Sequence, residues 1–275
     1  MRAVVIGHLE WVEFIRVGHV PARGEIVHAE EWWEEPGGGG SVAAVQLGKL
    51  GADTAFFTAL GDDELGHRAF DELSDRGVRV HAAFRSEATR RAVTHIDAAG
   101  ERTITVLGPR LAPHGSDDLP WAELEDADCV YFTAGDRAAL RSARAAPVLV
   151  ATSRAQPVVT ETGVPLDALV GSSFDPGEGF SPNDLSPVPR LCIWTESDRG
   201  GRFSIGDGAE QRYEASSLHG PIVDRYGAGD SFAAGLTFAL GAGEEIDKAI
   251  SLAARCGAAT LGGRGPYEGQ LQFRS

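Results

Sequence analysis

The sequence has few cysteines, no long apolar run and a deficit of positive charge. Three cysteines lie far apart among 275 residues and have apolar neighbours, so we expect buried, reduced thiols and neither a metal cluster nor a disulfide framework. The longest apolar runs, such as Ala3–Ile6 and Val148–Ala151, are far shorter than the roughly 20 residues of a membrane helix. Met1 leads directly into a strand-like run rather than a signal peptide, so we expect a cytoplasmic protein.

Basic residues are outnumbered: 25 Lys and Arg face 40 Asp and Glu, which gives a formal net charge of −15 at pH 7. Such a surface repels polyanions, so neither nucleic acid nor an anionic membrane is an expected partner. A small anionic ligand would need a local binding device, such as the backbone amides at a helix start or a few arginines. The composition is otherwise that of an ordinary globular protein, with 43% hydrophobic and 24% charged residues.

Strand-like and helical segments alternate along most of the chain, which predicts a mostly parallel sheet with helices on both faces. Gly40 precedes a helix that we expect to begin at Ser41, as N-cap, and to stop at Gly51. The other expected strands are 3–6, 55–58, 129–132, 148–151, 168–170 and 191–194, with a further strand starting at Val78, and the other expected helices are 64–76, 228–240 and 245–261.

Two segments do not fit this alternation. Residues 24–35 are extended and mixed in polarity, and Arg91–Ile96 and Arg102–Leu107 alternate around a glycine-containing turn, as in a β-hairpin. They predict a small β appendage, which on an α/β sheet commonly covers a ligand site. Residues 174–189 are rich in Pro, Gly, Ser and Asp and predict a surface loop.

The strongest chemical signal is Gly227-Ala228-Gly229-Asp230 at the start of an apolar helical segment. A glycine turn that opens a helix leaves backbone N–H groups unpaired and pointing one way, which suits the oxygens of a transferring phosphoryl group. Asp230 in the first turn could accept the proton of an attacking hydroxyl. The alternative interpretation is purely structural: a glycine-rich loop in which Asp230 only caps the helix.

Three stretches, Gly37–Ala52, Gly61–Gly66 and Asp224–Phe232, match in order the two signature regions of a known family. On these motifs the chain resembles the ribokinase-like PfkB carbohydrate kinases over nearly its whole length. The resemblance implies a single α/β/α domain spanning 1–275, with lid segments at about 8–36 and 90–108. It also implies ATP as phosphoryl donor with Mg²⁺, a monovalent cation such as K⁺ as a further candidate, and a homodimer formed through the β lid.

The resemblance assigns roles to individual residues. Asp230 would be the general base, and Gly227, Ala228 and Gly229 would form the anion hole. On the sugar side, Gly38 and Gly39 would let a hydroxyl approach the backbone. The nucleotide or phosphate side would comprise Thr195, Glu196, Gly200, Asp224, Arg225 and Arg264.

Several positions depart from the family pattern. Glu10 and Val12 stand where ribokinase has an Asn and an Asp, and Val42 stands where an Asn follows the double glycine. The family's Asn-x-x-Glu element is replaced by Ser172–Asp175, in which only Asp175 could hold a metal. Since unpaired polar groups typically cost about 1–3 kcal/mol, ribose is not the expected substrate. Glu10, with Asp136 from the opposite wall, would hold the hydroxyls instead.

The leading interpretation is therefore a kinase acting on an alcohol of a sugar or sugar-like compound. Alternatives are a nucleoside kinase that uses Trp11 or Phe14 against a base, and a catalytically weak or silent ligand-binding protein of the same fold. A further question concerns the arginines in or beside the lid hairpin. Pointing inward they would suit a phosphorylated or carboxylated sugar, and facing water they would be ordinary surface charges; they are Arg90, Arg91, Arg102 and Arg110.

Overall fold

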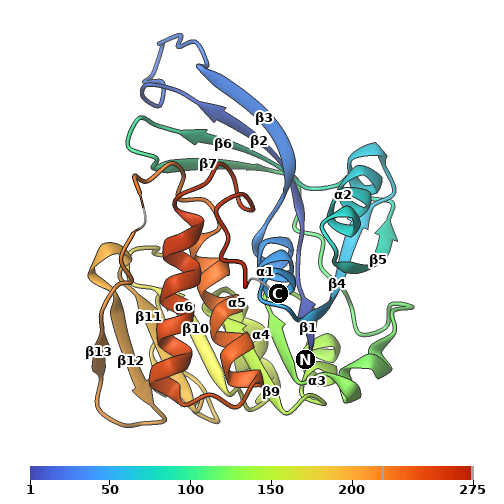
Figure 1. Cartoon of the computed structure of the whole chain (residues 1–275). Coiled ribbons are helices and arrows are strands. Elements are labelled where there is room, and N and C mark those ends of the chain that lie inside the picture. The colour runs from blue at the N-terminus through green and yellow to red at the C-terminus, as the bar shows by residue number, and fades with distance from the viewer. Residues whose placement is uncertain (219, 274–275) are drawn as a thin grey trace.

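A large sheet forms the centre of the computed structural model, which describes residues 1–218 and 220–273 (Figure 1). Over these residues its strand order is β13-β12-β11-β10-β9-β8-β1-β4-β5, and the neighbours from β5 to β11 pair in parallel. The pairs β11–β12 and β12–β13 are antiparallel. The bounds are β1 Arg2–Ile6, β4 Asp53–Gly61, β5 Arg79–Arg85, β8 Cys129–Phe132, β9 Val148–Thr152, β10 Ala168–Ser172, β11 Leu191–Thr195, β12 Gly201–Ile205 and β13 Gln211–Tyr213.

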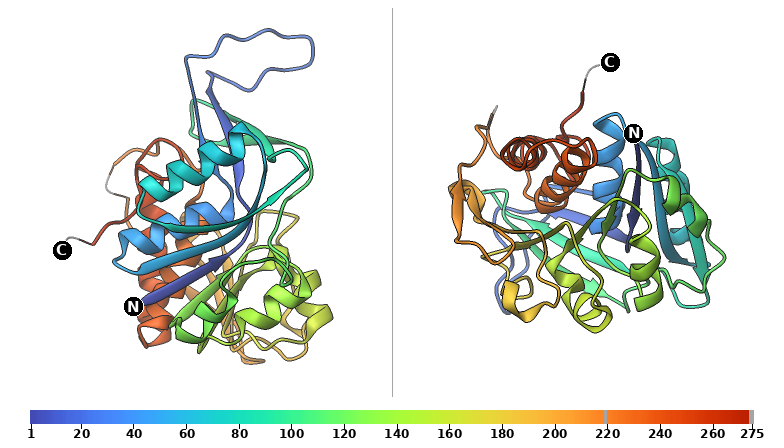
Figure 2. Two further views of the ribbon diagram at one scale, coloured as in Figure 1. Left: turned by 90° about the vertical axis from the view of Figure 1, so that its right-hand side faces the viewer. Right: turned by 90° about the horizontal axis from the view of Figure 1, so that it is seen from below.

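Both faces of this sheet are buried, which explains why its strands are apolar almost throughout. Side chains of alternate residues enter two separate clusters, so Ala3 and Val5 join one and Val4 and Ile6 the other. The first cluster packs against α1 (Gly39–Lys49), α5 (Ala228–Gly241) and α6 (Ile246–Thr260), and the second against α3 (Arg137–Ala143) and α4 (Gln156–Thr162). Figure 2 shows the resulting layers, which confirm the predicted α/β/α fold. Helix α2 (Glu64–Asp75) lies beside β4 and β5, and short 3₁₀ turns span Trp121–Asp126, Ser153–Ala155, Pro182–Asp184 and Ser197–Arg199.

A second, smaller sheet stands over one end of the large one (Figure 1). Within the described chain its order is β3-β2-β6-β7, with β2 at Glu10–Arg16, β3 at Glu31–Gly37, β6 at Arg91–Ile96 and β7 at Arg102–Leu107. The predicted hairpin is confirmed, with Arg91 opposite Leu107 and Ile96 opposite Arg102. Because β1 leads into β2 and β3 leads into α1, the small sheet is tied to the carboxyl ends of the central strands.

Helix α1 begins earlier than predicted. Its N-cap is Gly38, with φ 88°, so the assignment of Ser41 as the cap was wrong. The Ser41 hydroxyl instead donates to the carbonyl oxygens of Gly37 and Gly38, at 2.7 and 2.9 Å. The sequence analysis also missed β2, α3, α4, β12 and β13, which are short, 7 residues or fewer.

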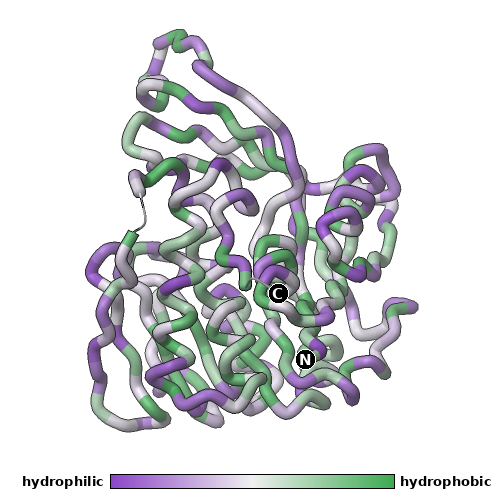
Figure 3. The backbone as a smooth tube through the Cα atoms, viewed as in Figure 1, coloured by the Kyte–Doolittle hydropathy of each residue, from purple (hydrophilic) through white to green (hydrophobic). Residues whose placement is uncertain are grey.

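The three cysteines, Cys129, Cys192 and Cys256, are buried and free, and burial raises the pKa of each thiol to about 12. Hydrophobic stretches lie mainly on the strands of the large sheet, whereas α2 and β3 carry hydrophilic ones (Figure 3). Among the described helices, none has the length and apolar character that crossing a bilayer requires.

Candidate active site

The glycine turn before α5 takes the form that the sequence predicts. Gly227 is the N-cap, with φ 78°, a left-handed conformation that favours glycine, and α5 starts at Ala228. A side chain at Gly227 would also meet Val42 Cγ1 at 2.9 Å. No atom would lie within 4 Å of a Cβ at Gly229, so this part of the turn is open. The first N–H groups of α5 therefore face accessible space and can bind an anion.

Asp224 holds this turn in place. Its side chain is fully buried, and its carboxylate accepts hydrogen bonds from the backbone N–H groups of Tyr226 at 2.8 Å and Gly265 at 3.0 Å. Burial nevertheless raises the pKa of Asp224 above its usual range. With one oxygen on the loop before α5 and the other on the loop after α6, Asp224 fixes the geometry of the anion-binding turn.

The two glycine-rich motifs meet at Asp230. A Cβ at Gly39, in the first turn of α1, would lie 2.6 Å from Asp230 Oδ1, so only a glycine leaves room for this carboxylate. The N–H of Gly38 donates to the hydroxyl of Tyr226 at 3.0 Å, which joins the start of α1 to the loop before α5. Two helix N-termini and one carboxylate thus converge from segments almost 200 residues apart in sequence.

Asp230 has the properties of a general base that works near neutral pH. The surrounding protein raises its pKa to about 7, because burial disfavours the charged form and Glu178 repels it, while Arg102 and Arg154 oppose the rise. The side chain still keeps partial contact with solvent. A base of this pKa is ionised often enough to accept a proton and binds that proton firmly enough to help the reaction.

Glu10 occupies the next part of the site. It is 6% exposed, its Oε2 lies 3.1 Å from Arg90 Nε, and its Oε1 accepts a long hydrogen bond of 3.4 Å from the hydroxyl of Tyr226. Burial raises the pKa of Glu10 despite the neighbouring arginine. Gly38 lies between Glu10 and His8, since a Cβ there would meet the backbone nitrogen of one and the ring of the other at 3.3 Å. These groups form a polar surface beside Asp230.

A pair of carboxylates lies on the other side of Asp230. Arg154 forms ion pairs with Asp175 and, at 2.8 Å, with Glu178. The sequence analysis missed Glu178, whose charge acts on Asp230. The spacing could have revealed it. Asp175-Pro176-Gly177-Glu178 resembles the family's Asn-x-x-Glu element, with Asp in place of Asn, and begins three residues after the start of the stretch Ser172–Asp175 that was assigned to it. Arg154 and Tyr226 are further residues near Asp230 to which sequence reasoning assigned no role, whereas Arg102 was considered only as one of the lid arginines.

The residues predicted for the nucleotide side fall into two groups. Thr195 lies at the carboxyl end of β11, and Gly200, with φ 73°, packs so closely on β13 that a Cβ would meet Tyr213 O at 2.1 Å. The other side chains are engaged in ion pairs. Glu196 pairs with Arg202 and Arg212, Arg225 with Glu101, and Arg264 with Glu31.

Three residues predicted to contact the substrate have other contacts. Val12 and Val42 are 0% exposed and belong to the core beneath the glycine turns. Asp136 caps α3, where its Oδ1 accepts from the N–H groups of Ala139 at 2.8 Å and Gly115 at 2.9 Å. Val12 and Val42 offer no polar group to a sugar, and Asp136 uses its Oδ1 to bind backbone N–H groups, so the proposed sugar contacts do not include these three residues.

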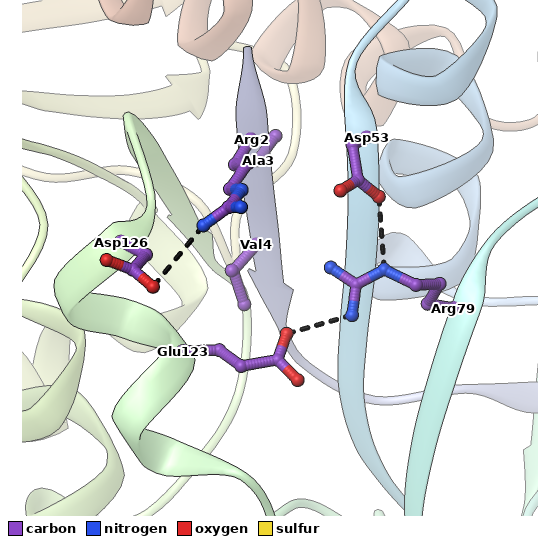
Figure 4. Close-up of a pocket in the computed structure, with 7 residues that line it drawn as sticks. All are labelled: Arg2, Ala3, Val4, Asp53, Arg79, Glu123 and Asp126. Carbon is purple, nitrogen blue, oxygen red and sulfur yellow. Dashed lines mark hydrogen bonds and ion pairs between the residues drawn. The ribbon is translucent and has the colours of Figure 1, made fainter.

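A separate pocket lies at the amino ends of the strands, where β1 and β4 begin (Figure 4). Its charged side chains neutralise one another: Arg79 pairs with Asp53 at 3.0 Å and with Glu123 at 2.8 Å, and Arg2 pairs with Asp126 at 3.3 Å. Ligands of open α/β sheets bind at the carboxyl ends of the strands, where Asp230 lies. The pocket of Figure 4 is therefore a structural ion-pair cluster at the amino ends.

An anion-binding turn beside a carboxylate that titrates near neutrality suits phosphoryl transfer, so the class of protein is a small-molecule kinase of ribokinase-like fold. Residues 2–157 and 186–272 match the pfkB family of carbohydrate kinases. The chain therefore belongs to the PfkB carbohydrate kinase family.

Individual relatives agree with this assignment. The chain is 27% identical to the ATP-dependent ribose-1-phosphate kinase of Halopiger xanaduensis, over 96% of this chain and 93% of that protein. It is 26% identical to the ribokinase of Bacillus subtilis, over 86% of this chain and 84% of that protein. The structure of Arabidopsis thaliana ribokinase complexed with ribose and ATP is similar in fold, with a TM-score of 0.74 at 19% identity over 98% of this chain and 96% of that one.

Proposed function

We propose that this carbohydrate kinase transfers the terminal phosphoryl group of ATP to a hydroxyl of a sugar or sugar-like molecule, with Asp230 as the general base. The observation that carries the proposal is the position of the Asp230 carboxylate. Asp230 is in the first turn of α5, and its carboxylate lies close to Gly39 of α1. The pKa of this carboxylate is raised to about 7.

In the reaction, Asp230 accepts the proton of the attacking hydroxyl as its oxygen bonds to the terminal phosphorus. The bond from that phosphorus to the bridging oxygen of ADP breaks, and ADP leaves with the electron pair. The N–H groups at Gly227, Ala228 and Gly229 stabilise the charge on the transferring oxygens. Arg102 and Arg154, whose charges act on Asp230, add positive potential at the same place.

Mg²⁺ fits the carboxylates that face the phosphoryl site, and it would neutralise charge on the phosphates. Mg²⁺ in kinases takes one or two carboxylates together with phosphate oxygens and water. Asp175 and Glu178 supply such a pair, and the repulsion between Glu178 and Asp230 indicates that their charges share one region. Among the described residues no cluster of three or more acidic, His or Cys side chains forms a complete metal site, which suits an ion that arrives with ATP.

The nucleotide would lie along Thr195 and Gly200, with Asp224 keeping the anion hole in register. Glu196, Arg225 and Arg264 would support this region through the ion pairs that hold its loops. The enzyme would also require K⁺, which is tested by exchanging KCl for NaCl in the assay. We further propose a cytoplasmic homodimer formed through the small sheet, which would act as a lid over the sugar.

The two alternatives have less support. A nucleoside kinase would need an aromatic ring free to stack on a base, but Trp11 is 1% exposed beneath the guanidinium of Arg68, and Phe14 is fully buried and stacked on Trp33. A silent binding protein would have no use for a carboxylate held near a pKa of 7, since ionising a buried group costs stability.

The test is ADP release from Mg-ATP with a panel of pentoses, hexoses, deoxy-keto sugars, sugar phosphates, polyols and nucleosides. Asp230→Asn is the control. Release above the background of this variant with one sugar class would support the proposal. ATP binding without ADP release across the whole panel, in the presence of both K⁺ and Mg²⁺, would argue for the silent alternative.

A further inference from the structure

The part of the site around His8 and Glu10 carries an excess of positive charge. His8 and Glu10 lie on either side of Gly38, and three arginines act on both of them, namely Arg90, Arg110 and Arg154. The overall charge of the chain is −15, so this local accumulation of cations is not a general feature of the surface. It needs an explanation within the site.

Two of the three arginines have partners. Arg90 lies 3.1 Å from Glu10, and its side chain is only 13% exposed. Arg154 is neutralised by Asp175 and Glu178. Arg110 differs, because it forms no ion pair and no hydrogen bond with the described residues.

Arg110 is exposed, so a ligand from solvent can reach it, and it lies in a pocket. Arg110 lines a pocket of about 340 Å³ together with Arg85, Glu87, Pro109, Leu111, Ala112 and His114. Arg85, the other arginine there, is fully used by a bidentate pair with Asp117, at 2.8 and 2.6 Å. Loss of hydration lowers the pKa of Arg110, and repulsion by Arg90 and Arg154 adds to this shift. The pocket thus holds one arginine that no carboxylate neutralises, Arg110, and one acidic residue, Glu87.

Two polar groups deeper in the site lack a partner. The Nδ1 atom of His8 and the hydroxyl of Thr133 are buried and form no hydrogen bond with the described residues. Burial and the three arginines lower the pKa of His8 to about 3, so its ring is neutral at any physiological pH. A neutral imidazole and an unpaired hydroxyl suit the hydroxyls of a sugar, whereas the free guanidinium suits an anion.

We infer that the acceptor is an anionic sugar, whose reacting hydroxyl lies at Asp230 and whose phosphate or carboxylate group lies at Arg110, with Arg90 beside it. The inference rests on the proposed function and names the substrate class of the same site. Phosphate and carboxylate groups each present two oxygens to which a guanidinium can donate two parallel hydrogen bonds. An uncharged sugar would leave the guanidinium of Arg110 unpaired and would not reduce the repulsion among Arg90, Arg110 and Arg154.

The experiment compares matched acceptors in the ADP-release assay. The probes are ribose against ribose 1-phosphate and ribose 5-phosphate, fructose against fructose 1-phosphate and fructose 6-phosphate, and gluconate or 2-keto-3-deoxygluconate as carboxylates. The expected result is that at least one phosphorylated or carboxylated probe exceeds its neutral counterpart in kcat/KM by 10-fold or more. The phosphate and carboxylate arms identify which anion the pocket takes.

The variant Arg110→Gln should reduce this preference by about 10- to 100-fold, since a hydrogen bond to a charged group is worth about 1.5–3 kcal/mol. Arg110→Lys should retain part of it. Arg91→Gln is the matched control, because Arg91 lies one residue after Arg90 but pairs with Glu13 on the other face of β6. Equal kcat/KM for neutral and anionic probes, or an unchanged preference in Arg110→Gln, would overturn the inference while leaving the kinase proposal intact.

Binding separates failure of the inference from failure of the proposed function. Calorimetric titration of the favoured anionic probe into Asp230→Asn protein needs no turnover. Binding that Arg110→Gln weakens and Arg91→Gln does not would support the anion site even if no probe releases ADP. Absence of binding by every anionic probe, in a protein that binds a neutral sugar, would refute it.

Discussion

At the scale of single residues, the site depends on how far its surroundings change ordinary side chains. Asp230 is an aspartate at a helix N-terminus, a place that normally favours the charged form. Burial and the repulsion of Glu178 outweigh that preference and raise its pKa to about 7. The same burial acts on Glu10 and Asp224, whose pKa values are also raised. Burial thus raises the pKa values of three carboxylates near one site, and that of Asp230 reaches about 7.

The pH dependence of the reaction should follow Asp230. Because only the ionised form accepts a proton, kcat should rise with pH through about 7 and level off above it. Asp230→Asn should lower kcat by about 100- to 10,000-fold and abolish this rise. Initial rates from pH 5.5 to 9 measure both effects, and a wild-type profile that is flat across this range would exclude Asp230 as the base.

The raised pKa of Asp230 also predicts that the stability of the fold falls as pH rises, whereas kcat increases. A carboxyl whose pKa is raised by folding stabilises the fold while protonated, and this contribution is lost as pH rises through about 7. Asp230→Asn stays neutral, so it should be more stable than the wild type at pH 8, by no more than about 4 kcal/mol, and the gain should shrink toward pH 4.

Thermal unfolding at several pH values measures this gain. Asp247→Asn is the matched control, because Asp247 is also in the first turn of a helix but is exposed. An equal change in both variants would show that the effect belongs to the helix terminus rather than to the buried site.

At the scale of elements, the proposed active site lies where the N-termini of two helices meet. Helix α1 begins at Gly39 because Gly38 adopts a φ of 88°, and α5 begins at Ala228 because Gly227 adopts a φ of 78°. Neither start uses a side-chain cap, so the unpaired N–H groups remain available to ligands. A serine or aspartate cap would have stabilised each helix but would have occupied the anion site.

Gly39→Ala tests this arrangement. Its Cβ would lie 2.6 Å from Asp230 Oδ1, so the carboxylate must move, and a displacement of this kind should lower kcat by about 100-fold. Gly48→Ala in the same helix is the control: the nearest atom to its Cβ would be Thr54 Oγ1 at 4.0 Å, so activity should be kept and stability should rise by about 1 kcal/mol. Kinetics and thermal unfolding of both variants distinguish the outcomes, and full activity in Gly39→Ala would contradict the close approach.

At the scale of the whole molecule, the small sheet has two unlike faces. One face carries Phe14, which contacts Trp33 and Tyr226 and so packs toward the large domain. The opposite face carries Trp32, 67% exposed, and Leu107, 43% exposed, together with the half-buried Ile15 and Val93. Exposed aromatic and aliphatic side chains on one face are typical of an interaction surface.

The proposed homodimer would cover that face. Purified protein should therefore have about twice the 29.0 kDa mass of the chain in light scattering, and Trp32→Glu combined with Leu107→Glu should give a monomer. Ile205→Glu, at an exposed end of β12 in the large sheet, is the control and should leave the mass unchanged. A monomeric wild type at micromolar concentration would contradict the dimer.

The short elements β2, α3, α4, β12 and β13 could not be predicted from the sequence. The long helices, the apolar strands of the large sheet, the β6–β7 hairpin and the glycine turn with Asp230 could be. These are local properties: apolar runs, alternation and glycine positions record the backbone conformation of their own segment. Only the tertiary structure decided which polar groups share the cleft. Glu178, Arg110 and Arg154 lie in loops and turns whose sequences constrain their neighbours weakly, whereas Val12, Val42 and Asp136 were assigned to the sugar by position alone and are instead buried or bonded to backbone N–H groups. Charge and burial act through space, so the pKa of Asp230 and the unpaired Arg110 exist only once distant segments have been brought together.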